Sequence, residues 1–250
     1  TSLGFSESMY HPTNGNLEFV ELLNTRGEPQ DLGGWRLGGS IACTFPAGTV
    51  IPGGGFLVVA RSPAELESAY GITGVLGPFA NDLPNNNGTV TLINPAGAVF
   101  LKVEYADDPP WPAAADGAGH SLVLARPSYG ENNPLAWAAS DGIGGSPGRV
   151  NPFTPDPLRN VVINEFLAHT DLPALDYVEL YNHSTQAVDL AGCVLSDSAD
   201  VDKFVIPSGT TIPARGFVYY TQDELGFGLS AEGETIYLKN AARTRVASPT

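Results

Sequence analysis

The chain has 250 residues, of which 42% are hydrophobic and 16% are charged. This length can bury the core of one large domain or of two ordinary ones. The formal net charge is −15, with −8 on residues 1–152 and −7 on residues 153–250. An acidic chain without a basic patch repels nucleic acid, and no apolar run reaches the roughly 18 residues of a membrane span. Both composition and charge therefore point away from DNA binding and membrane insertion.

Short runs with alternating polarity, separated by Gly- and Pro-rich turns, predict strands in the first 125 residues. In the strand over 18–23, Val20 and Leu22 are expected to face the core and Glu21 to face solvent. The segments 46–51 and 56–60 are predicted to pair through Pro52–Gly55. The other predicted strands cover residues 3–9, 35–37, 89–93, 99–105 and 120–125.

One helix interrupts this pattern at residues 62–70. Ser62 precedes Pro63, and Glu65 stands where it can form a capping box with the serine. Gly71 is expected to end the helix. The loop through 74–88 is predicted to be exposed, and residues 140–151 to form an extended tail.

The same sequence pattern then occurs a second time. FVELLN (19–24) matches YVELYN (177–182), QDLGGWRL (30–37) matches VDLAGCVL (188–195), and TVTLIN (89–94) matches TIYLKN (235–240). Up to Leu37 the equivalent positions differ by a constant offset of 158, so that Glu7, Glu21 and Asp31 correspond to Glu165, Glu179 and Asp189. A self-match of this length predicts tandem domains of one fold.

These motifs resemble the lamin tail domain as it occurs in secreted bacterial proteins. The resemblance rests on MYHP after the first strand, EFVELLN, DLGGWRL and PAGTVIPGGG, and it extends to SLVLARP (121–127) and GGSPGRVN (144–151). It implies an immunoglobulin-like β-sandwich in each copy. We therefore expect an all-β chain of two tandem immunoglobulin-like sandwiches, with at most one short helix in each.

The expected domains are 1–152, with a C-terminal extension, and 161–250, joined by the Pro-rich linker 153–160. Because Val246 aligns with Phe100, the second copy is expected to lack the strand equivalent to 101–105 and to be truncated. The chain also begins without Met, and we expect it to be part of a longer protein with neighbouring domains.

Two candidate sites emerge from the loops. Asp197, Asp200 and Asp202 form the densest group of hard oxygen ligands, so they are calcium candidates, although the alternative is a solvated acidic loop. Trp111, between acids and prolines, is a candidate for stacking on a sugar or anchoring a partner; alternatively it folds back onto the first sandwich. The recurring acids Glu7, Glu21 and Asp31 are expected to make strand-end and turn hydrogen bonds.

Other candidate residues lack the pattern that a catalytic or zinc site requires. Gly119–His120–Ser121 lacks the second glycine of a hydrolase nucleophile elbow, so Ser121 is expected on the sandwich surface. No zinc-ligand spacing surrounds His11 or His169. Cys43 and Cys193 are expected to be free, with Cys193 at a core position.

No catalytic residue and no cofactor other than calcium is therefore predicted. The function expected from these observations is a non-enzymatic, extracellular interaction or architectural module of a larger secreted or surface protein, with a protein or polysaccharide partner. The first alternative is a carbohydrate-binding module that acts with or without calcium. The second is a hydrolase with a site built from the loops of the first copy.

Overall fold

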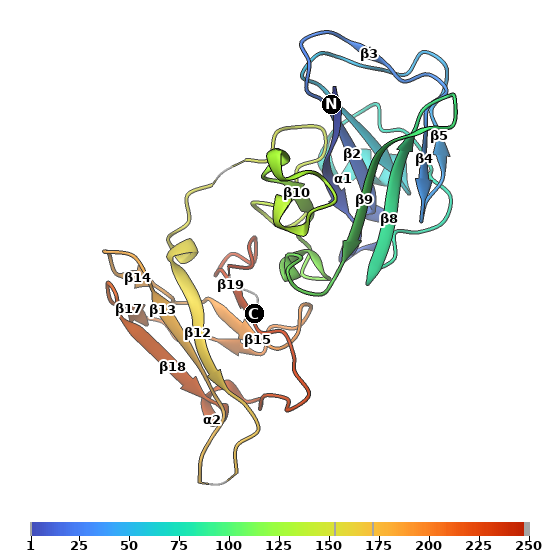
Figure 1. Ribbon diagram of the computed structural model, residues 1–250. Coiled ribbons are helices and arrows are strands. Elements are labelled where there is room, and N and C mark those ends of the chain that lie inside the picture. The colour runs from blue at the N-terminus through green and yellow to red at the C-terminus, as the bar shows by residue number, and fades with distance from the viewer. Residues whose placement is uncertain (1, 153, 172, 248–250) are drawn as a thin grey trace. The chain divides into compact units, whose positions relative to one another are not determined.

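The structure is a computed structural model that describes residues 2–152, 154–171 and 173–247 (Figure 1). The chain divides into two compact units, Thr1–Pro152 and Phe153–Thr250. Each unit has its own hydrophobic core. In the described part of the chain, no helix is long and apolar enough to cross a membrane.

The first unit packs two antiparallel sheets against each other, in the manner of a sandwich. One sheet has the order β11-β10-β1-β2-β7 and the other the order β5-β4-β8-β9, with the short pair β3-β6 beside them. Their bounds are β1 Leu3–Met9, β2 Phe19–Asn24, β3 Gln30–Asp31, β4 Arg36–Gly39, β5 Cys43–Thr44, β6 Val50–Ile51, β7 Phe56–Ala60, β8 Asn87–Ile93, β9 Val99–Ala106, β10 Leu122–Leu124 and β11 Trp137–Ala139.

The second unit repeats this plan with fewer strands. Its sheets have the orders β12-β13-β18 and β16-β15-β19, beside the pair β14-β17; Figure 1 shows β12, β13 and β18 side by side. Their bounds are β12 Val161–Leu167, β13 Tyr177–Asn182, β14 Val188–Asp189, β15 Val194–Ser196, β16 Phe204–Val205, β17 Thr211–Ile212, β18 Phe217–Thr221 and β19 Tyr237–Lys239. The all-β, immunoglobulin-like fold class predicted from the sequence is thus confirmed.

Two α-helices and five short 3₁₀ turns complete the described structure. The first helix, α1, ends at Gly71 in the left-handed conformation (φ 64°) as predicted. These elements are α1 Pro63–Tyr70, α2 Gln222–Leu225, η1 Gly15–Leu17, η2 Ala113–Ala115, η3 Pro127–Tyr129, η4 Pro134–Ala136 and η5 Pro157–Asn160. Leu158 of η5 is buried in the second core, so the segment after the prolines packs as part of the second unit.

Equivalent residues make the same contacts in both units. Asn24 is fully buried, and its Nδ2 donates to the carbonyls of Glu28 and Pro52 at 2.8 and 3.1 Å. Asn182 does the same with Gln186 and Pro213 at 2.7 and 2.9 Å. An amide that satisfies several buried carbonyls fixes the loop that follows the strand.

Acidic turn contacts recur as well. The Asp31 carboxylate accepts from the backbone N–H of Gly33 at 2.8 Å, and that of Asp189 accepts from Ala191 at 2.9 Å. The prediction that the repeated aspartates serve turn hydrogen bonds is therefore confirmed.

Several local predictions are wrong. The segments 46–51 and 56–60 do not pair with each other, because β6 pairs with β3 and β7 pairs with β2. Ser62 makes no side-chain cap, and Glu65 instead accepts from Asn16 Nδ2 at 3.1 Å. The capping box occurs in α2, between Thr221 and Glu224.

The loop through 74–88 is also less exposed than predicted. Phe79 and Leu83 are 4% and 1% exposed and belong to the first core. Leu76 forms a parallel bridge to Val59 at the edge of β7. This loop therefore extends the sheet rather than leaving it.

After β19, the described part of the second unit forms one further backbone pairing. Val246 bridges Lys239 in antiparallel register, and Ala247 N–H donates to the carbonyl of Leu238 at 2.7 Å. The predicted truncation concerns residues 247–250, of which 248–250 lie outside the described residues.

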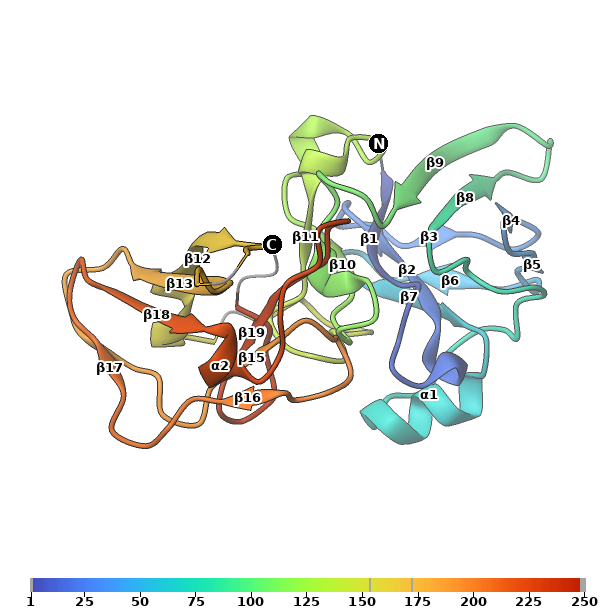
Figure 2. The same ribbon diagram turned by 90° about the horizontal axis from the view of Figure 1, so that it is seen from below.

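In the first unit, the face of the β1-β2-β7 sheet that points away from the main core is covered by other parts of the same unit. Helix α1 lies against this sheet (Figure 2) and places Leu66 in a second cluster with Met9, Phe19, Val58 and Ala60. The C-terminal extension covers the same face, because Gly148 N–H donates to Glu21, which was expected in solvent but is only 1% exposed. Alternation along a strand separates two faces, but in this unit both faces are buried.

Candidate binding face

The equivalent face of the second unit is open. The β12-β13-β18 sheet carries on this side a set of aromatic and acidic residues, which we call the open face: Glu165, Leu167, Tyr177, Glu179, Tyr181, Phe217 and Tyr219. Phe217 and Tyr219 are 53% and 61% exposed. Tyr181 stacks on Phe217 with ring centroids 4.6 Å apart. Exposed aromatic residues gathered on one surface mark an interaction site more often than single ones do.

Strand register explains why these side chains gather. Glu165 is opposite Glu179, Glu179 is opposite Tyr219, and Tyr181 is opposite Phe217. Directly opposed residues on an antiparallel pair project to the same side of the sheet. A register shift between Ile163 and Glu165 places Glu165 on this side.

The first unit has the same register with different surroundings. Its shift lies between Phe5 and Glu7, and Glu7 is opposite Glu21, which is opposite Val58. Glu7 is 2% exposed and Val58 is 5% exposed. The two units thus share one strand register, but this face of the sheet is buried in the first unit and exposed in the second.

Two carboxylates lie buried under the cover of the first unit. Glu7 accepts from Ser146 N–H at 2.8 Å and contacts the Ser121 hydroxyl, while Glu21 accepts from Ser6 Oγ and Gly148 N–H, both at 2.6 Å. Burial, together with the neighbouring Glu7, raises the pKa of Glu21 to about 8. Burial also raises the pKa of Glu7, against the lowering effect of its serine hydrogen bonds.

Ser121 is therefore not the surface residue expected from the sequence. It is fully buried, because β10 pairs with β1 and brings Ser121 next to Glu7. The adjacent His120 is 1% exposed, with Nδ1 2.9 Å from the carbonyl oxygen of Ser140. Both residues hold the extension onto the sheet.

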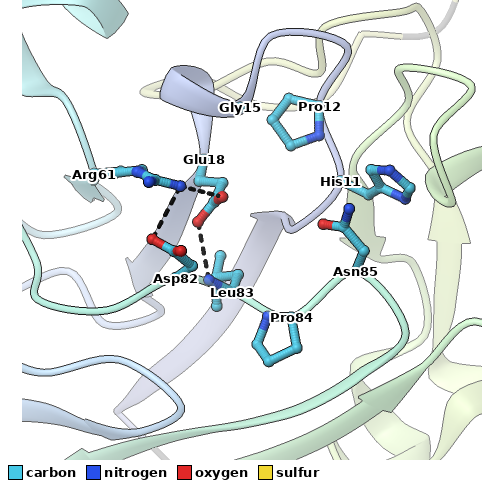
Figure 3. A pocket seen from close by; sticks show the side chains of 9 residues that line it. All are labelled: His11, Pro12, Gly15, Glu18, Arg61, Asp82, Leu83, Pro84 and Asn85. Atoms are coloured by element: carbon cyan, nitrogen blue, oxygen red, sulfur yellow. Dashed lines mark hydrogen bonds and ion pairs between the residues drawn. The ribbon is translucent and has the colours of Figure 1, made fainter.

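A recess of about 480 Å³ lies beside α1 in the first unit (Figure 3). Arg61 Nη1 lies 3.0 Å from Glu18 Oε1 and 2.9 Å from Asp82 Oδ1, and Glu18 also accepts from Leu83 N–H at 2.9 Å. Burial raises the pKa of Glu18. These ion pairs fasten the 74–88 loop to the strand, so the charged groups are engaged in structure.

His11 lines the same recess (Figure 3). Its Nδ1 lies 2.6 Å from Asp116 Oδ1. An imidazole oriented by a carboxylate supplies two of the three members of a nucleophilic triad. Within the described residues, no hydroxyl or thiol hydrogen-bonds to this ring, and no three His, Cys, Asp or Glu side chains are grouped to hold a metal ion.

Two of the three calcium candidates form ion pairs with basic side chains, and the third, Asp200, is exposed. Asp197 pairs with Lys203 at 2.6 Å, and Asp202 lies 3.2 Å from Lys239 and also pairs with Arg243. The hydrogen bonds to Arg243 and Lys239 lower the pKa of Asp202 against the effect of burial. A cation would have to displace these ammonium and guanidinium groups.

Trp111 does not offer an exposed ring. It is 9% exposed, belongs to the first core and packs at 6.3 Å from Trp137. Trp111 therefore folds back onto the first sandwich, as the alternative interpretation of the sequence predicted. The cysteine thiols are free: Cys43 is half-buried, and Cys193 occupies the core position that the repeat predicted.

The sequence contained one signal for the open face that was missed. Phe19, Val58 and Leu23 of the first copy are replaced by Tyr177, Tyr219 and Tyr181 in the second. Phe19 and Val58 are buried and Leu23 is partly buried, so exchange of these apolar residues for tyrosines indicates a face that meets water.

Two stacked antiparallel sheets in each unit, with matching registers and turn contacts, define a tandem immunoglobulin-like module. The family model of the Lamin Tail Domain matches residues 1–107 and 154–250. The chain belongs to the lamin tail domain family, with two copies of the domain in tandem.

Other comparisons add little. No curated protein matches the chain. Among solved structures, it is similar to an exo-β-D-glucosaminidase CsxA in complex with a castanospermine analogue (10% identity, 98% of this chain, TM-score 0.25). It is also similar to the exo-chitosanase CsxA of Amycolatopsis orientalis (12% identity, 98% of this chain, TM-score 0.22). The chain spans 26% of the length of either enzyme, and TM-scores this low carry no argument about function.

Proposed function

We propose that the chain is a non-catalytic interaction module of a larger secreted or cell-surface bacterial protein, in which the open face binds a partner. One observation carries this proposal: the same sheet face is buried by α1 and the extension in the first domain and exposes Phe217 and Tyr219 at 53% and 61% in the second. Tyrosine and phenylalanine are enriched where proteins bind partners.

Several observations support a role without catalysis. The acids that recur in both copies make turn and sheet contacts, and Arg61 and Glu18 are paired with each other. The extracellular setting follows from the resemblance of the motif string to secreted bacterial lamin tail domains. In such a setting the first domain, with both faces of its sheet buried, acts as a rigid spacer.

A second candidate function is carbohydrate binding by the same face. The Tyr181–Phe217 pair presents stacked rings next to the carboxylate of Glu179, and aromatic rings beside hydrogen-bond acceptors suit a sugar. Calcium assistance through Asp197, Asp200 and Asp202 belongs to this candidate.

A paired selection tests the proposed function. The full chain is exposed to a phage library of random peptides and to a glycan array, the latter with calcium and with a chelator. We expect ligands that bind the chain but not the variant Phe217→Ser/Tyr219→Ser.

The control for that selection is Val205→Ser, because Val205 is an exposed apolar residue (51%) on a different sheet of the same domain. Ligands should bind this variant as well as the unmodified chain. Failure of both libraries to yield a ligand that depends on the open face would overturn the proposal.

A further inference from the structure

We infer that the open face accepts a polypeptide segment with the chemistry of the first domain's own cover, a glycine- and serine-rich turn followed by a basic residue. This inference rests on the proposed function and specifies the partner. In the first domain that cover is residues 140–151, with the sequence SDGIGGSPGRVN.

The first domain shows how such a segment is held. Ser146 donates its N–H to one oxygen of Glu7 at 2.8 Å and its hydroxyl to the other at 3.1 Å. Two residues later, Gly148 donates its N–H to Glu21 at 2.6 Å. Two opposed acidic side chains on neighbouring strands thus accept hydrogen bonds from successive donors of one turn.

The second domain keeps the acceptors of this arrangement. At the register shift, Asn164 Nδ2 donates to Glu179 Oε1 at 2.8 Å, as Ser6 Oγ donates to Glu21 Oε1 at 2.6 Å. The Tyr177 hydroxyl donates to Glu165 Oε1 at 2.6 Å. Each carboxylate is thereby oriented through its Oε1 atom. In the first domain Glu21 is held in the same way by Ser6, and its other oxygen, Oε2, accepts the N–H of Gly148.

The surroundings of the carboxylates suit a reversible contact. Phe19 and Val58 are permanently covered by α1, whereas their equivalents Tyr177 and Tyr219 carry a hydroxyl on an apolar ring. Such side chains are stable both in water and against a partner, which is why tyrosine is common in binding surfaces. The open face is therefore suited to reversible binding of a partner.

The shape of the cover restricts the ligand. Gly145 has φ +75°, and a Cβ at this position would lie 2.1 Å from Glu7 Oε1. A side chain here would prevent the close approach of the turn to the carboxylates. Arg149 acts favourably on the Glu7 carboxylate, and a basic residue in the ligand is likewise attracted to a domain with a net charge of −7.

The test is a titration of the ¹⁵N-labelled full chain with a synthetic peptide of residues 141–151, followed by amide chemical shifts. We expect shifts on β12, β13 and β18 that saturate with peptide concentration. Glu179→Gln should weaken binding about fivefold, because a charged acceptor is replaced by a neutral one. Glu232→Gln, an exposed acid elsewhere in the domain, should leave binding unchanged.

A second peptide, with Gly145→Ala and Ser146→Ala, should not bind. Absence of shifts with the first peptide at millimolar concentration would overturn the inference, as would shifts confined to β1 and β2. Shifts of the open face by a soluble oligosaccharide and not by the peptide would assign the face to a glycan. Shifts that grow with protein concentration alone would assign it to a second copy of the chain.

The two proposals can fail separately. One outcome would be a random-peptide ligand of unrelated sequence that requires Phe217 and Tyr219 for binding. It would support the proposed interaction function and contradict the inference about the partner's sequence.

Discussion

At the scale of single residues, Asn24 and Asn182 each join a strand end to two loop segments. Replacing either by Ala leaves buried carbonyls without their donor, and the expected cost is roughly 2–3 kcal/mol of unfolding free energy. Urea unfolding measures it, by tryptophan fluorescence for Asn24→Ala and by circular dichroism for Asn182→Ala. Asn85→Ala, in an exposed loop, should change little; equal effects of all three would contradict the assigned role.

Glu21 makes the stability of the first domain depend on pH. The pKa of Glu21 is about 8 in the folded state, against an ordinary glutamate value of 4.5, so the folded state keeps a proton that the unfolded state releases between these limits. The contribution of Glu21 to stability should therefore be fully present below about pH 4.5 and fall by roughly a few kcal/mol as the pH rises toward 8.

The variant Glu21→Gln should flatten this pH profile, because the amide does not titrate in that range. The measurement is the urea midpoint by tryptophan fluorescence between pH 5 and 8. Glu232→Gln controls for the loss of one surface charge. A profile equally steep in Glu21→Gln would show that another group carries the dependence.

At the scale of elements, the same β-strand position has opposite sensitivity in the two domains. Val58→Ser places a hydroxyl in the cluster under α1 and should cost roughly 2–3 kcal/mol. Tyr219→Ser, at the equivalent position but 61% exposed, should stay within about 0.5 kcal/mol. Chemical unfolding of each variant checks the contrast, and similar losses would mean that the second face is covered in solution.

The extension 140–151 depends on one glycine for its approach to the sheet. Gly145→Ala should release this segment, because the methyl group would overlap Glu7. Gly130→Ala is the matched control: its φ is also positive, at +85°, but no atom lies within 4 Å of the added carbon. We expect faster hydrogen exchange at Ser146 and Gly148 only in Gly145→Ala; protection that persists would contradict the role of this turn.

At the scale of the whole molecule, each domain has its own core, so each is expected to unfold as its own cooperative unit. All three tryptophans, Trp35, Trp111 and Trp137, lie in the first domain. Tryptophan fluorescence should therefore report one transition and far-ultraviolet circular dichroism two. Coincident single transitions by both probes would contradict independent folding.

Internal repetition made the fold predictable. Three sequence signals indicated the fold: the constant offset between the copies, the alternation in β2 and β13, and the turn residues Asn24 and Asp31. Each of these signals reflects contacts that form within a few residues or that recur in both copies. Helix α1 was predicted from Pro63 and Gly71 for the same reason. The pairing of β6 and β7 was predicted incorrectly, because a Gly-rich turn resembles a hairpin even when it links different sheets.

The sequence by itself determined the two-domain β-sandwich and the positions of most strands, because these follow from periodicity and turn chemistry along the chain. Only the tertiary structure decided that Glu21 is buried while Glu179 stays partly exposed, that Ser121 meets Glu7, and that Trp111 lies in a core. The reason is physical: strand alternation assigns a residue to a face, whereas the segments that cover that face, α1 and the extension 140–151, lie elsewhere in the chain.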